Sequence, residues 1–189
     1  MKNNSDTKQK LIQVTREMID QQGIDAINMR DLGKKINLSR GALYRHFKNK
    51  DDLLATIATE NFVLLNRNIQ LLSDKIYEPR PLLYAILLAY YDFGINNQEH
   101  YQLMFRKQWD KEMYPELVTS AFFMFTSVEK CLEKAGNIRK SSNQSTAMMY
   151  AFIHGLVELN ISEHSESEKG LDSPIQLIDS FLDLIFMNS

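Results

Sequence analysis

The chain has 189 residues, of which 44% are hydrophobic and 24% are charged, proportions typical of a globular protein with one or two small domains. Because it lacks a run of about 18 apolar residues and an apolar leader, we expect a cytoplasmic protein without membrane contact. The single cysteine, Cys131, excludes an internal disulfide.

The net charge of −2 hides an uneven distribution. Residues 1–50 contain 11 Lys or Arg and 5 Asp or Glu, a net charge of +6, whereas residues 51–189 carry −8. A basic N-terminal segment on an acidic remainder favours contact between that segment and a polyanion. Chance clustering of charge is the alternative.

Apolar residues recur at helical spacing nearly throughout, and only seven glycines and four prolines interrupt them. The pattern therefore predicts an all-α protein of about nine helices. The first should span 7–22, capped by Ser5, Asp6 or Thr7 and stopped by Gly23 in a left-handed conformation.

The next two helices are short and close together. Asn28 is placed to cap a helix at 29–36, and Ser39 to cap one at 40–47. Between them, Asn37 should take the positive φ of a tight turn.

A longer helix should follow from about residue 50 to 72, with Asn49 as its cap and Asp52 completing an approximate capping box. The remaining predicted helices span 81–95, which Pro81 should open, 101–109, 114–136, 142–163 and 174–187. Residues 1–54 would then be a three-helix head, the fourth helix a connector to about residue 72, and residues 55–189 a helical regulatory and dimerisation domain.

Two short helices joined by a tight turn form a helix-turn-helix, whose second helix enters the major groove of DNA. Leu43 and Phe47 are four residues apart and should face inward. The residues of the second helix left facing outward are Arg40, Gly41, Tyr44, Arg45 and Lys48.

The outward residues suit different contacts. The small Gly41 and Ala42 would let the backbone approach the groove, and Arg40 or Arg45 would bind guanine. Tyrosine, histidine and lysine side chains suit phosphates, although Tyr44 covering the core and a plain surface histidine are alternatives. The predicted DNA-binding residues are Asn28, Arg30, Ser39, Arg40, Gly41, Ala42, Tyr44, Arg45, His46, Lys48 and Lys50.

The segment "GIDAINMRDLGKKINLSRGALYRHFKNKDDLL" resembles the DNA-binding domain of the tetracycline-repressor-like (TetR) family of bacterial regulators over roughly residues 7–55. Where Gly33, Ile36 and Asn37 stand, that family usually has alanine, alanine and glycine. The resemblance implies a homodimer that binds a palindromic double-stranded operator, usually as a repressor. It also implies that a small-molecule effector in the C-terminal body controls this binding.

In this family the last two long helices form a four-helix bundle with a partner chain. The apolar character of 174–187 on more than one side fits that role, and burial within one subunit is the alternative. The predicted dimer contacts are Ala147, Ala151, Gly155, Ile178, Phe181, Leu182 and Ile185.

Aromatic residues and methionines crowd the middle of the chain and predict a pocket for an apolar or aromatic ligand, unless they are simply core. The candidate lining residues are Tyr84, Tyr91, Met104, Phe105, Trp109, Phe122, Met149, Phe152 and His154. We find no catalytic or metal-ligating pattern and expect no enzyme, cofactor or metal. A binding or interaction module that does not read DNA, and an all-helical enzyme, are the competing hypotheses.

Overall fold

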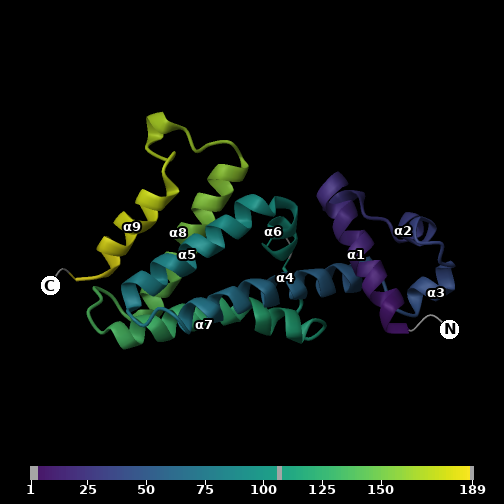
Figure 1. Ribbon diagram of the computed structural model, residues 1–189, viewed down its shortest axis with the longest axis horizontal. Helices are drawn as coiled ribbons and strands as arrows, with labels where there is room; N and C mark the ends of the chain where they lie inside the picture. Colours follow the sequence, from purple (N-terminus) through teal and green to yellow (C-terminus); the bar gives the residue numbers. More distant parts are fainter. Residues whose placement is uncertain (1–3, 106–107, 188–189) are drawn as a thin grey trace. The chain divides into compact units, whose positions relative to one another are not determined.

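The computed structural model describes residues 4–105 and 108–187. Over those residues the chain forms nine α-helices and two short 3₁₀ helices, and it has no β-strand (Figure 1). Within the described residues, Ile138 and Phe186 form an isolated antiparallel β-bridge. The all-α prediction is confirmed.

The chain divides into two compact units. The first runs to Phe62 and also includes Glu99–Val118, and the second comprises Val63–Gln98 and the chain from Thr119 onward. The functional boundary near residue 54 stays a prediction. Among the described residues, no helix has the length and apolar character needed to cross a membrane.

Short polar caps determine where the first helices begin. The elements are α1 (Asn4–Gln22), η1 (Ile24–Ala26), α2 (Met29–Lys35), α3 (Arg40–Tyr44) and α4 (Lys50–Ser73). Asn28 Oδ1 accepts from the Arg30 amide at 2.8 Å, and Ser39 Oγ accepts from the Ala42 amide at 3.2 Å. These two caps are confirmed.

The start of α4 follows the predicted approximate capping box in part. The Asp52 amide donates to Asn49 Oδ1 at 2.8 Å, and Asp52 Oδ2 accepts from the Lys48 amide at 2.8 Å. The Asp52 carboxylate thus accepts from the amide one residue before the Asn49 cap rather than from that of Asn49 itself, so the capping box is approximate.

The ends of α1 differ from the prediction. Since α1 begins at Asn4, Ser5, Asp6 and Thr7 lie in its first turn, and the prediction that one of them caps it is wrong. Gly23 has the expected positive φ of 79°, but its ψ of 167° is extended rather than left-handed helical. This conformation, open essentially to glycine alone, leads directly into η1.

The third helix ends at Tyr44, three residues earlier than predicted. The amides of His46 and Phe47 both donate to the Leu43 carbonyl, at 3.0 and 3.3 Å, so the backbone tightens into a turn. That turn places Asn49 at the cap of α4.

The later helices begin and end near the predicted positions. They are α5 (Pro79–Asn96), α6 (Gln98–Phe105), α7 (Pro115–Ala135), α8 (Ser142–Ile161) and α9 (Pro174–Ile185), with η2 at Ser167–Lys169. The helix α5 begins at Pro79, two residues before Pro81, which was predicted to open it; Pro79 occupies the first turn, where proline is favoured. The predicted helix at 101–109 includes residues 106 and 107, which lie outside the described residues.

In the second unit α5 packs against both α8 and α9, as Figure 1 shows. Leu83, Ile153 and Ile178, one from each helix, are completely buried. Arg80 of α5 also binds α9, with Nη2 2.9 Å from Asp179 Oδ1 and 2.6 Å from Asp183 Oδ1. Apolar packing and this ion pair together hold α9 against its own subunit.

Candidate nucleic-acid interface

The turn between α2 and α3 is tight because two residues allow it. Asn37 has the predicted positive φ, 56°, and the Leu38 amide donates to the Gly33 carbonyl at 2.8 Å. A β-carbon at Gly33 would lie 3.2 Å from the Leu38 carbonyl oxygen and 3.5 Å from Leu43 Cδ1. Glycine at 33 therefore lets α2 approach this turn closely.

Two buried apolar side chains, Leu43 and Phe47, anchor α3. Leu43 is 1% exposed and Phe47 is 2% exposed, so the prediction that both face inward is confirmed. On the other side Arg40, Gly41 and Arg45 are exposed, and Tyr44 is 41% exposed. The buried pair orients the short helix so that its basic and aromatic side chains face solvent.

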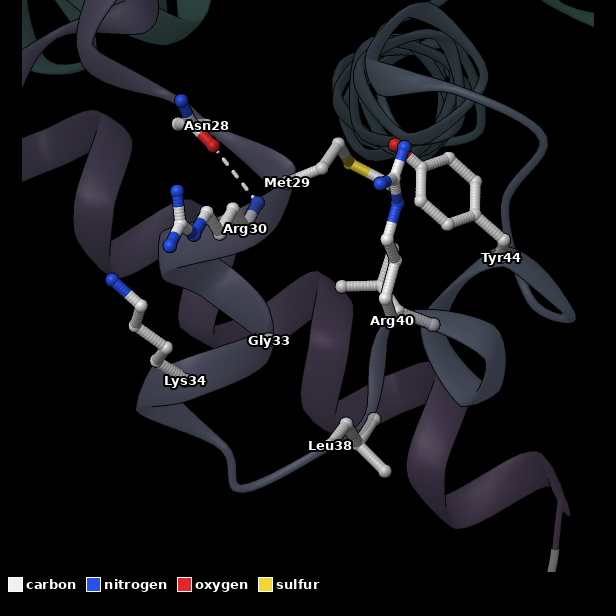
Figure 2. A pocket seen from close by; sticks show the side chains of 9 residues that line it. Asn28, Met29, Arg30, Gly33, Lys34, Leu38, Arg40 and Tyr44 are labelled. Atoms are coloured by element: carbon white, nitrogen blue, oxygen red, sulfur yellow. Dashed lines mark hydrogen bonds between the residues drawn. The ribbon is translucent and has the colours of Figure 1, made fainter.

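A surface hollow of about 590 Å³ lies between α2 and α3. Figure 2 shows Arg30 and Lys34 on the α2 side of this hollow and Arg40 and Tyr44 on the α3 side. The Arg40 guanidinium carbon lies 5.6 Å from the centre of the Tyr44 ring, a cation–π contact that limits the freedom of both side chains. We call these four residues and the space they enclose the cationic hollow.

Lys34 was not among the predicted DNA contacts, although it lines the hollow. The available signal was its spacing, because Lys34 follows Arg30 by four residues and so shares its face of α2. Lys34 Nζ also lies 3.2 Å from Asp31 Oδ1, an exposed pair that contributes little to stability.

Other predicted contacts have partners inside the protein. Asn28 and Ser39 use their side chains as helix caps. Lys50 is half-buried and its Nζ donates to the Ile24 carbonyl at 3.3 Å, which ties the start of α4 to η1. His46 is half-buried, whereas Lys48 is exposed. The structure therefore gathers Arg30 and Tyr44 with Arg40 around the hollow and gives Lys50 a structural bond.

One of the nine predicted ligand-pocket residues, Met149, lies at a gap between described residues of the second unit. Together with six neighbours, Met149 borders this small gap, which has no room for a water molecule. Phe122 is 60% exposed, which does not fit a place in a closed pocket. The residues around this gap are Leu87, Met124, Phe125, Val128, Thr146, Met149 and Tyr150.

Other members of that predicted set pack as core residues. Met104 is 2% exposed, Trp109 is 9% exposed, and Phe105 meets Phe62 edge to face with ring centres 5.3 Å apart. Tyr91 is 5% exposed, and burial raises the pKa of its hydroxyl. Tyr84 is half-buried.

His154 is a hydrogen-bonded interior residue. Its Nε2 lies 2.8 Å from the Tyr90 hydroxyl, and its ring centre lies 4.3 Å from that of Tyr150. Burial lowers the pKa of His154 to about 4, so the imidazole is neutral near pH 7. Burial also raises the pKa of the Tyr150 hydroxyl.

The predicted dimer contacts separate into two groups. Ile178, Leu182 and Ile185 are 0%, 0% and 2% exposed within one chain, so the prediction that they contact a partner is wrong. They face their own subunit, the alternative that the helical pattern had left open. Ala147 and Gly155 are exposed.

An outward apolar face nevertheless covers both helices. Phe152 of α8 and Phe181 of α9 stack with ring centres 4.1 Å apart and planes 3° apart. Leu184 is 69% exposed and Met148 is 47% exposed. The α8–α9 face consists of Ala147, Met148, Ala151, Phe152, Gly155, Leu177, Phe181 and Leu184.

Comparison with known proteins agrees with the geometry of the first unit. Residues 11–57 match the family described as "Bacterial regulatory proteins, tetR family". The chain is 24% identical to the uncharacterized HTH-type transcriptional regulator YobS of Bacillus subtilis (strain 168), over 97% of this chain and 94% of that protein.

Solved structures share the fold. A protein of unknown function from Rhodococcus sp. RHA1 superposes with a TM-score of 0.82 at 18% identity, covering 95% of each chain. A TetR-family transcriptional regulator from Agrobacterium tumefaciens gives a TM-score of 0.73 at 15% identity, covering 98% of this chain and 100% of that one.

Proposed function

Because the chain belongs to the tetR family of bacterial regulatory proteins, we propose that it is a sequence-specific DNA-binding transcriptional regulator that acts as a homodimer. The observation that carries the proposal is α3, held from below by Leu43 and Phe47, with Arg40, Tyr44 and Arg45 directed to solvent. An apolar anchor on one side and cations on the other are what a groove-reading helix needs.

We assign the contacts by chemistry. Arg40 at the first position of α3 and Arg45 just after it present guanidinium groups that match the O6 and N7 acceptors of guanine. Gly41 and Ala42 add little bulk, so the helix can approach the base edges. Tyr44 and the remaining cations of the hollow suit phosphates, which set position rather than sequence.

A second copy of the chain is the proposed occupant of the α8–α9 face. Phe152, Phe181 and Leu184 leave an apolar area open to solvent, and the exposed Ala151 and Gly155 permit close approach of another helix. A two-fold dimer presents two copies of α3, which requires an operator with matching symmetry.

We further propose that the protein is a repressor that a small apolar or aromatic molecule releases from DNA, with residues 1–54 reading DNA and 55–189 dimerising and binding the effector. The lining of the gap at Met149 is apolar, so a molecule admitted there would be uncharged. Opening of this gap would be needed to admit the ligand.

Selection of bound duplexes from a random pool at low salt tests the proposal. We expect enrichment of one two-fold symmetric sequence, whose affinity falls with salt at a log–log slope of about −0.9 per neutralised phosphate. The double variant Arg40→Ala, Arg45→Ala should enrich no sequence. A wild-type pool without a common motif would contradict the proposal.

A further inference from the structure

A chain of polar contacts runs through the interior of the first unit and joins α1, α4 and α6. Arg16 Nη1 donates to Asn61 Oδ1 at 2.7 Å. Asn61 Nδ2 lies 3.1 Å from His100 Nδ1, and His100 Nε2 lies 3.2 Å from Asp20 Oδ1. Asn61 is 3% exposed and His100 is 6% exposed, so water cannot readily replace these partners.

The direction of every bond in this polar chain follows from its first member. Arginine has no acceptor, so the oxygen of the Asn61 amide must face Arg16 and its NH₂ group must face His100. His100 Nδ1 must then accept, which places the ring proton on Nε2, where it is donated to Asp20. One protonation state of the imidazole satisfies all of the partners.

The surrounding charges act on this histidine from all three helices. Burial lowers the pKa of His100 below its ordinary value; Asp20 raises it, Arg16 lowers it further, and Glu99 raises it. From α4, Glu60 pairs with Arg16, with Oε2 and Nη2 2.9 Å apart. The imidazole is therefore neutral near pH 7, and it takes up a second proton only in more acidic solution.

A second bond connects α6 to the head. Glu99 Oε2 accepts from the Ile24 amide at 3.2 Å, and Ile24 begins η1, which leads into α2. Neighbouring residues of α6, Glu99 and His100, thus hold η1 and α4 respectively. A change in α6 must therefore reach the helices that carry the proposed DNA contacts.

We propose that Asn61 and His100 are positioning residues that hold the DNA-binding helices on α6, and that protonation of His100 at Nδ1 releases this hold. A proton on Nδ1 would face the NH₂ group of Asn61, and two donors cannot bond. Rotation of the amide by half a turn offers no relief, because its NH₂ would then face Arg16. The contact between α4 and α6 is lost.

The effect on DNA binding rests on the function proposed above, and His100→Asn tests it. Its amide oxygen can still accept from Asn61 but does not titrate. At constant salt, we compare the affinity of wild type and variant for the selected duplex at about pH 7.5 and about pH 5, on either side of the ordinary histidine pKa. His46 is present in both proteins, so any effect that it has on binding cancels in the comparison.

Each protein is compared with its own affinity near neutral pH. On acidification, wild-type affinity should fall by about fivefold or more relative to that of the variant, the cost of one opposed buried donor pair. Identical pH profiles would overturn the inference. If the wild type binds no duplex at either pH, the proposed function fails.

Nitrogen NMR of the wild-type His100 imidazole tests which ring nitrogen carries the proton, without DNA and without a variant. A neutral His100 with its proton on Nε2 is expected. A proton on Nδ1 at neutral pH would overturn the inference whether or not DNA binds.

Discussion

Replacing Leu184 with aspartate should dissociate the proposed dimer, because this side chain lies on the α8–α9 face and is 69% exposed in the single chain. It follows Phe181 by three residues and so lies beside the ring that stacks on Phe152. In the single chain most of the Leu184 side chain therefore contacts water, and it becomes buried only when a second subunit covers it.

The structure sets the magnitude. Complete burial of a leucine side chain contributes about 1.5–3 kcal/mol, so the two-thirds of Leu184 left exposed contributes about 1–2 kcal/mol when a partner covers it. Two-fold symmetry doubles this to about 2–4 kcal/mol, or a dissociation constant raised about 30- to 1,000-fold. Desolvation of the new carboxylates adds to the loss.

Sedimentation equilibrium over a concentration series measures the dissociation constant. Met113→Asp is the matched control, since Met113 is 65% exposed but belongs to the first unit. We expect weak self-association for Leu184→Asp and wild-type behaviour for Met113→Asp. Equal dimer stability for Leu184→Asp and wild type would refute the assignment of this face.

Three further changes test other parts of the structure. Leu43→Ala should lower the free energy of unfolding by about 2–5 kcal/mol in urea denaturation, because it empties a completely packed site beneath α3. Arg40→Ala should weaken binding of the selected duplex by about 5- to 150-fold in a titration, whereas Arg67→Ala, which removes an exposed charge from the second unit, should not. The folded pKa of His154, about 4, lies below its unfolded value of 6.5; its contribution to stability is therefore complete above pH 6.5 and lost as pH falls toward 4. When His154→Phe is denatured with urea over the same pH range, its free energy of unfolding should not show the part of the decline that protonation of His154 causes.

Local sequence signals were sufficient to predict most of the helix caps and turns of the head, residues 1–54. Asn28 and Ser39 cap the helices that follow them, and Asn37 takes its positive φ, because each depends on interactions within a few residues. The end of α3 was missed because the amides of His46 and Phe47 share the Leu43 carbonyl, which tightens the backbone into a turn after Tyr44.

Contacts between residues far apart in the sequence could not be predicted from local sequence signals. The pattern of α9 showed apolar residues on more than one side, and only packing on α5 shows that Ile178 faces inward and Leu184 outward. The polar chain joins Arg16, Asn61 and His100 across gaps of 45 and 39 residues, and nothing in their local sequence links them.

Chemical footprinting of guanine N7 on the selected duplex tests most directly whether two copies of α3 read the major groove. The account predicts protection in two symmetric half-sites, with centres one helical turn of about 10–10.5 base pairs apart or a multiple of it, and loss of this protection in Arg40→Ala, Arg45→Ala. Unprotected guanines, or protection confined to a single site, would contradict it.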